Sequence, residues 1–262
     1  MTTIRYAART PEQLRNRELQ ATSVGAWATS LVAVYETDPE VLSAVLPPPI
    51  SARSEPHVKV TIASVDLGRP GLPPFGAGSF SVAATHEGTD GWYALLMPMT
   101  TEQSVIGGRE TFGEPKKLGQ VALDRDGDHV RGTIARLGTT IAEISGTVGD
   151  AVETTDGTRT DFYFKFLLSP DGKGFDDEPS LVYCHRDETT REAHAVDRAE
   201  LVLRDSRFDP VADLPVRRLV SVTVAERRSV QRGEIVGKVP SEGLLPFVHQ
   251  RYDDLSPVGD DS

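Results

Sequence analysis

The sequence predicts a mostly β protein, either a sheet closed into a barrel or two packed antiparallel sheets, with a few short helices at its edges. Many short stretches alternate apolar and polar residues, which is the period-2 pattern of half-buried strands. Asp-Gly pairs, which favour tight turns, occur at 90–91, 126–127, 156–157 and 171–172. Helical patterns are few. Many short strands at close spacing are typical of β-barrels and β-sandwiches.

Two short helices are expected near the start of the chain. Thr10 can cap a helix and Gln13 can complete its capping box, so we expect a helical arm over residues 10–22. A strand follows over residues 27–35, where apolar and β-branched residues dominate. A second helix begins at Asp38 and ends before the run of three prolines that follows, because proline cannot continue a helix.

The remaining elements are predicted to be strands. Val58, Val60 and Ile62 alternate with Lys59 and Thr61, as in a strand with one buried face. The same reasoning predicts further strands over residues 78–86, 92–99, 121–123, 130–137, 139–148, 162–168, 181–185, 192–203 and 219–230.

Composition limits the domain count and the partners. A chain of 262 residues can bury one large core, and we expect a single domain over residues 1–262 with an acidic, frayed tail over 253–262. The net charge of −11 disfavours nucleic acid, which needs basic patches, and also anionic membrane surfaces. We therefore expect no nucleic-acid or membrane partner.

Metal, disulfide and cofactor sites are not expected. Cys184 is the single cysteine, and its strand-like surroundings predict a buried structural thiol. The six histidines have no metal-ligand spacing, and the chain has no phosphate-binding loop or dinucleotide motif. The first residues do not resemble a signal peptide, and no apolar run approaches the ~20 residues that span a bilayer, so we expect a cytoplasmic protein.

One segment carries distinctive chemistry, the stretch from Gly107 to Gly119, which we interpret as a glycine-punctuated loop. It holds two adjacent lysines, Lys116 and Lys117, in an otherwise acidic chain. Burial and a neighbouring like charge both lower a lysine pKa. A lysine that is neutral near pH 7 is a nucleophile that can form a Schiff base with a carbonyl group.

The size of the required pKa shift indicates what the fold must supply. Lowering a lysine pKa by about four units requires roughly 5.5 kcal/mol of interaction free energy that favours the neutral amine over the ammonium. A like charge ~4 Å away supplies only about 1 to 4 kcal/mol. Most of the shift must therefore come from desolvation in an apolar pocket. Plausible wall residues, which would also contact a substrate, are Phe75, Met97, Met99, Phe112 and Leu118.

The lysine segment resembles the active-site segment of the acetoacetate decarboxylase family. The match consists of Gly-Arg-Glu at 108–110 followed by Glu-Pro-Lys-Lys-Leu at 114–118. Segments at 35–49, 164–172 and 208–216 resemble other parts of that family in the same order, so the resemblance covers roughly residues 25–255. It implies a closed β-barrel with helices at its edge, an apolar pocket at one end, and a homo-oligomer.

The resemblance also implies roles for the two lysines. Lys116 takes the position of the imine-forming lysine, and Lys117 takes that of its neighbour. Glu114 lies two residues before Lys116. It either faces the same side and moves protons at the carbinolamine, or faces water because Pro115 turns the chain.

Three further residues are candidates for contact with a substrate. Arg109 and Glu110 either form an ion pair that fixes the segment, or Arg109 holds a substrate carboxylate. Tyr252 either delivers a phenol to the site or is a packing residue.

The departures from the family pattern bear on the substrate. Decarboxylating members carry an arginine in the first strand and glutamates before the lysine segment. Here residues 26–30 contain no arginine, and no acid lies between Arg69 and Glu87. This pattern favours the lysine chemistry of the family and disfavours acetoacetate itself.

We therefore expect a Schiff-base lyase that decarboxylates a β-keto acid through an imine on Lys116, with a small keto acid as its partner. One alternative is a pyruvate-type aldolase-dehydratase that uses the same lysine. The other is a non-catalytic small-molecule-binding β-barrel that retains it.

Overall fold

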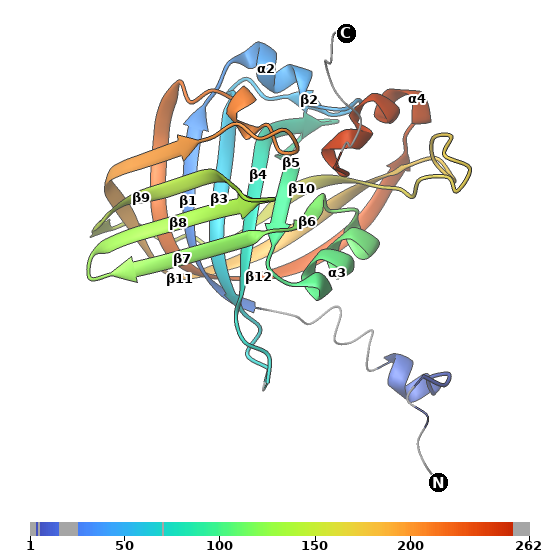
Figure 1. Cartoon of the computed structure of the whole chain (residues 1–262), viewed down its shortest axis with the longest axis horizontal. Coiled ribbons are helices and arrows are strands. Elements are labelled where there is room, and N and C mark those ends of the chain that lie inside the picture. The colour runs from blue at the N-terminus through green and yellow to red at the C-terminus, as the bar shows by residue number, and fades with distance from the viewer. Residues whose placement is uncertain (1–3, 5, 16–25, 70, 254–262) are drawn as a thin grey trace.

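Strands make up most of the structure, a computed structural model that describes residues 4, 6–15, 26–69 and 71–253. Seven strands close into a barrel in the order β1-β3-β4-β5-β10-β11-β12 (Figure 1). The ring closes because β10 pairs with both β5 and β11, and β12 pairs with both β11 and β1. The barrel strands are β1 (Ala26–Glu36), β3 (His57–Asp66), β4 (Phe75–His86), β5 (Thr89–Met99), β10 (Gly157–Lys165), β11 (Ser180–Leu203) and β12 (Arg218–Lys238).

A second layer of three strands covers one side of the barrel. It consists of β7 (Gln120–Asp126), β8 (His129–Arg136) and β9 (Thr139–Ala151), and β9 pairs with the last part of β11. The layer crosses the outer face of β1, β3 and β4 (Figure 1). The two layers touch closely, since a Cβ on Gly132 of β8 would lie 2.9 Å from the side chain of Ile62 of β3.

The main core lies between these two layers. Alternate residues of β1, β3 and β4 point outward into it, because successive strand residues face opposite sides. Their core-facing side chains pack with those of β8 and β9; the set includes Leu31, Ala33, Tyr35, Val58, Val60, Ile62, Phe80, Val82, Ile134, Ile141 and Ile144. The other face of each barrel strand is therefore left to line the interior of the barrel.

Short helices sit at the barrel ends, as the sequence predicts. They are α2 (Pro39–Ala44), α3 (Glu102–Phe112), α4 (Ser241–Leu244) and the 3-10 turns η1 (Val211–Asp213) and η2 (Leu245–Gln250); two short strands, β2 (Ser51–Ala52) and β6 (Lys116–Leu118), complete the fold. None of the helices in the described ranges is both long and apolar enough to span a membrane.

Most of the predicted elements are confirmed. The capping box forms, with backbone-to-side-chain bonds of 3.0 and 3.3 Å between Thr10 and Gln13, and residues 11–15 are helical. The rest of the expected arm (residues 16–22) and of the acidic tail (254–262) lies outside the described residues. The stretches 181–185 and 192–203 belong to one continuous strand, β11.

Two local predictions are wrong. The β4–β5 turn is at Glu87-Gly88 rather than Asp90-Gly91, because Glu87 and Gly88 both take positive φ there while Asp90 and Gly91 lie in β5. The segment before the lysines is not a loop. It is the helix α3, which ends at Gly113 in the left-handed conformation that glycine favours.

Candidate active site

A cavity of about 320 Å³ occupies the interior of the barrel. This volume is in the range of small-molecule sites. One wall is apolar and includes Phe75, Met97, Met99 and Phe112, as the sequence predicts. Leu118 does not belong to this wall: it is the last residue of β6 and is 55% exposed.

Lys116 points into this cavity because of the strand that carries it. Strand β6 pairs in parallel with β5, and Lys116 lies opposite Met97. The Lys116 side chain is 13% exposed, and its Nζ lies 2.7 Å from Oε2 of Glu114. Successive residues of a strand face opposite sides, so Lys117 points away from the cavity.

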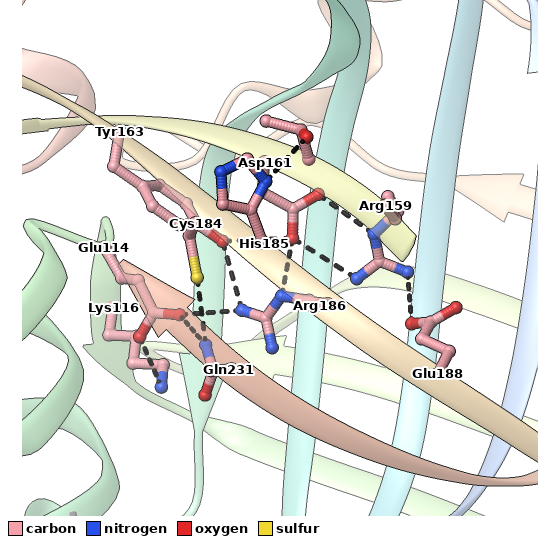
Figure 2. Close-up of polar contacts among 11 residues, drawn as sticks. Glu114, Lys116, Arg159, Asp161, Tyr163, Cys184, His185, Arg186, Glu188 and Gln231 are labelled. Carbon is pink, nitrogen blue, oxygen red and sulfur yellow. Dashed lines mark hydrogen bonds and ion pairs between the residues drawn. The ribbon is translucent and has the colours of Figure 1, made fainter. Parts of the chain in front are cut away.

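Glu114 is fully buried and faces the lysine, which decides between the two orientations considered above. Its Oε1 accepts hydrogen bonds from Arg186 Nη2 at 2.8 Å and from Gln231 Nε2 at 3.1 Å (Figure 2). Burial alone would raise the pKa of Glu114, but Lys116 and Arg186 outweigh it and hold that pKa below its ordinary value. Glu114 is therefore a carboxylate held between two cations.

The ion pairs continue across the barrel as a chain of alternating charge (Figure 2). Arg186 Nε lies 2.6 Å from Oδ2 of Asp161, whose Oδ1 lies 3.0 Å from Nε of Arg159. Arg159 Nη1 in turn lies 2.6 Å from Oε1 of Glu188. Burial would raise the pKa of Asp161, but Arg159 and Arg186 lower it well below its ordinary range. The chain thus runs from Lys116 to Glu188 with each charge facing an opposite one.

Two further cations line the cavity, Lys59 and Arg227. Within the described part of the chain, neither forms an ion pair. Lys59 Nζ lies 4.1 Å from the ring centroid of Trp92. Burial, with a smaller contribution from Arg159, holds the pKa of Lys59 well below its usual value. Five basic and three acidic side chains therefore meet in or beside the cavity. Basic groups outnumber acidic ones there even with Lys59 neutral, in a chain of net charge −11.

Lys117 belongs to a separate buried cluster. Its Nζ lies 3.3 Å from Oδ1 of Asp209 and 3.0 Å from Oδ1 of Asp253. Arg136 contacts the same two carboxylates at 2.7 and 2.6 Å, and its Nη1 donates to the Leu118 carbonyl at 2.7 Å. This quartet ties β6 to β8 and to the C-terminal segment.

Arg109 contacts the backbone of strand β6 outside the cavity. Its Nη1 donates to the carbonyl oxygens of Lys116 at 3.0 Å and Arg251 at 3.1 Å, and its guanidinium lies 5.0 Å from the ring centroid of Tyr252. Glu110 is exposed and does not pair with it, so the ion pair considered above does not form. Neither Arg109 nor Tyr252 lines the cavity.

Sequence reasoning missed most of the charged cavity residues. The signal was present: Arg159, Asp161 and Tyr163 alternate on β10, and Arg186 and Glu188 alternate on β11. Polar residues at period two ordinarily indicate a face in water. In a closed barrel that face is instead the enclosed interior.

Within the described ranges, no group of three or more His, Cys, Asp or Glu side chains is placed to hold a metal ion. Cys184 is buried, and burial raises the pKa of its thiol to about 11. The positions of β1 and β4 that line the cavity carry uncharged side chains, in line with the departures noted in the sequence. Apart from Val32 and Phe75 they are small: Ala26, Ala28, Ser30, Ala77, Gly78, Ser79 and Ser81.

The comparison with known proteins gives consistent matches. The family model described as acetoacetate decarboxylase (ADC) matches residues 8–239. An acetoacetate decarboxylase of Burkholderia cenocepacia is 28% identical over 197 residues, which is 72% of this chain and 78% of that protein. The crystal structure of acetoacetate decarboxylase from Legionella pneumophila superposes with a TM-score of 0.71 at 22% identity, covering 88% of this chain and 98% of that one.

A second solved structure is similar in fold. The enduracididine biosynthesis enzyme MppR, in complex with pyruvate, superposes with a TM-score of 0.72 at 16% identity, covering 82% of this chain and 90% of that one.

Proposed function

Because this chain belongs to the acetoacetate decarboxylase family, and is thus a decarboxylase-like lyase, we propose that it decarboxylates a β-keto acid through an imine on Lys116. The single observation that carries the proposal is the Lys116–Glu114 pair, with 2.7 Å between Nζ and Oε2, at the wall of the barrel cavity. An amine in contact with a buried carboxylate supplies the nucleophile and the acid–base group that imine chemistry uses.

The first steps use both members of the pair. Glu114 accepts a proton from the Lys116 ammonium, and the neutral amine attacks the ketone carbon of the substrate. A proton then moves from the attached nitrogen to the carbonyl oxygen, which gives a neutral carbinolamine. Glu114 then returns its proton to the hydroxyl group, which leaves as water, and the iminium remains on Lys116.

The later steps use the iminium as an electron sink. The bond between the α-carbon and the carboxylate breaks, its electron pair moves into the iminium, and CO₂ leaves. The resulting enamine takes a proton from solvent on its carbon. Water then hydrolyses the new iminium, which releases the ketone and restores Lys116. The small keto acid is the only partner this scheme needs.

A pyruvate-type aldolase-dehydratase is the second candidate. The small side chains of β1 and β4 leave room in the 320 Å³ cavity for a second carbonyl compound. The solved structure of MppR holds pyruvate, which is the kind of donor this reaction uses. The enamine would then attack an aldehyde carbon instead of taking a proton, and the adduct would lose water.

Product analysis distinguishes the candidates. The purified protein is incubated with acetoacetate and longer β-keto acids, or with pyruvate and an aldehyde, and the products are followed by NMR. We expect ketone and CO₂ above the background of the Lys116→Ala protein, with the exposed-lysine variant Lys173→Ala as active as the parent. Aldol or dehydrated products would favour the second candidate. If turnover in every mixture equals that of Lys116→Ala, the protein is a binding barrel and the proposal is wrong.

A further inference from the structure

Arg227 and Ser229 on β12 each carry a buried polar atom that no group in the described part of the chain satisfies. Both line the cavity, and Arg227 Nε and Ser229 Oγ are buried without a hydrogen-bond partner within the described part of the chain. Buried polar atoms almost always have a partner, and leaving one unpaired costs about 1–3 kcal/mol, more for a charged group. Two such donors side by side therefore point to a ligand.

The nearby carboxylates are already engaged. Glu188, opposite Ser229 across the β11–β12 ladder, is paired with Arg159 at 2.6 Å. Glu226, the neighbour of Arg227 in sequence, is paired with Arg191 at 3.0 Å. Lys59 also lines the cavity without a carboxylate partner among the described residues. The cavity thus holds cationic groups that its own anions do not neutralise.

These groups lie away from the reacting lysine. Residues 227, 229 and 231 face the same side of β12, and Gln231 donates to Glu114, which contacts Lys116. Arg227 is four residues from Gln231 along the strand, which is about 13 Å at ~3.3 Å per residue. Its neighbour on β1 is Ala28, which leaves the space beside the guanidinium open.

We propose, on the basis of the function proposed above, that Arg227 and Ser229 form a second anion site and that the substrate is a keto acid with an additional carboxylate remote from its ketone. A guanidinium binds a carboxylate with two parallel hydrogen bonds, and the Ser229 hydroxyl supplies a third donor. Lys59 lines the same cavity. Burial holds its pKa well below the usual value, and that pKa would rise when an anion binds.

The test compares two six-carbon keto acids that differ only at the far end, 2-oxohexanedioate and 2-oxohexanoate. Each is titrated against the intact protein with borohydride present, and the adduct is quantified by mass spectrometry. We expect the concentration that gives half-maximal labelling to be at least about ten-fold lower for the dicarboxylate than for 2-oxohexanoate. Arg227→Gln should remove this preference and leave labelling by 2-oxohexanoate intact. Arg228→Gln, at the adjacent exposed position of β12, should retain the preference.

A second arm does not depend on imine formation. Hexanedioate and hexanoate, which have no ketone, are titrated by calorimetry into the intact protein and the same two variants. Tighter binding of hexanedioate that Arg227→Gln abolishes supports the anion site, even if no adduct forms and the proposed function fails. Equal affinities for the two acids, or a preference that Arg227→Gln leaves unchanged, would overturn the inference, even if both keto acids form adducts.

Discussion

Gly108 sets how closely helix α3 can approach the reacting pair. A Cβ at this position would collide with the Glu114 carboxylate and would lie 2.6 Å from Cδ and Nζ of Lys116. Gly107, one residue earlier in the same helix, has open space at the equivalent point. The two glycines are therefore a matched pair, since both substitutions to alanine favour the helix and only one disturbs the site.

We predict that Gly108→Ala lowers imine trapping at least ten-fold, because the added methyl group separates Glu114 from Lys116. Gly107→Ala should give as much borohydride-trapped imine as the parent and should unfold at an equal or slightly higher urea concentration. Both variants are measured by borohydride labelling and by urea unfolding. Full labelling of Gly108→Ala would show that the close packing of α3 is not required for the chemistry.

Glu114 gives a second prediction at the level of one residue. Glu114→Gln keeps the shape of the side chain but removes the proton acceptor beside Lys116. We expect the rate of imine formation to fall by about 10²–10⁴-fold at neutral pH, the usual contribution of general acid–base catalysis. The rate is measured by rapid quenching with borohydride. An unchanged rate would mean that another group or water accepts the proton.

Strand β6 is the element that separates the two lysines. It is three residues long, yet it places Lys116 in the cavity and Lys117 in the buried quartet with Arg136, Asp209 and Asp253. Removing Lys117 would leave Asp209 and Asp253 to share Arg136 as their one cation within the quartet. The cost is therefore below the range of about 3–5 kcal/mol that is typical of a buried ion that loses its sole partner.

Lys117→Met should therefore lower the free energy of unfolding by about 1–3 kcal/mol, measured by urea denaturation. Lys173→Met, on an exposed loop, should change it by less than about 0.5 kcal/mol. The lysine adduct of the Lys117→Met protein should still form on Lys116. If Lys117→Met is as stable as the parent but no longer forms the adduct, Lys117 takes part in imine formation.

Elements with a strong local signal were predictable, and elements held by tertiary contacts were not. The alternation of Val58, Val60 and Ile62 indicated β3 correctly because one face of that strand meets the core between the layers. Helix α3 was missed since Gly107 and Gly108 each disfavour a helix by about 1 kcal/mol relative to alanine. It forms because it packs closely against the lysine segment. That close packing also explains Gly108, since a larger residue there would collide with Glu114 and Lys116.

At the scale of the molecule, an acidic chain encloses a positive cavity. The position of Lys116 was predictable from its motif, but the ion chain from Glu114 to Glu188 was not. Its members come from the lysine segment, β10 and β11, and they meet only because the barrel closes through the pairing of β10 with both β5 and β11. A cavity with low-dielectric walls and an excess of one sign of charge concentrates ligands of the opposite sign, which fits a keto acid.

The buried carboxylates give the whole molecule a defined acid sensitivity. The pKa values of Glu114 and Asp161 are held below their ordinary values of 4.5 and 3.8, because neighbouring cations outweigh burial. As pH falls through the ordinary values, the unfolded chain takes up protons that the folded protein does not. The free energy of unfolding therefore decreases with falling pH.

We predict that urea midpoints fall as pH is lowered from about 6 to about 3, and that Glu114→Gln reduces the slope of this decline. Glu40→Gln, an exposed carboxyl on α2, should leave the slope unchanged. An identical slope in Glu114→Gln and the parent would mean that Glu114 does not carry the charge assigned to it here.

The measurement that tests the central claim most directly is peptide mapping after borohydride reduction with a keto acid. We predict one adduct, of the mass of the reduced imine, on the peptide that contains Lys116, with none in Lys116→Ala and full labelling in Lys173→Ala. An adduct on Lys59, which also lines the cavity, would mean that Lys59 and not Lys116 forms the imine. No adduct with any keto acid that calorimetry shows to bind would make this protein a binding barrel and contradict the account.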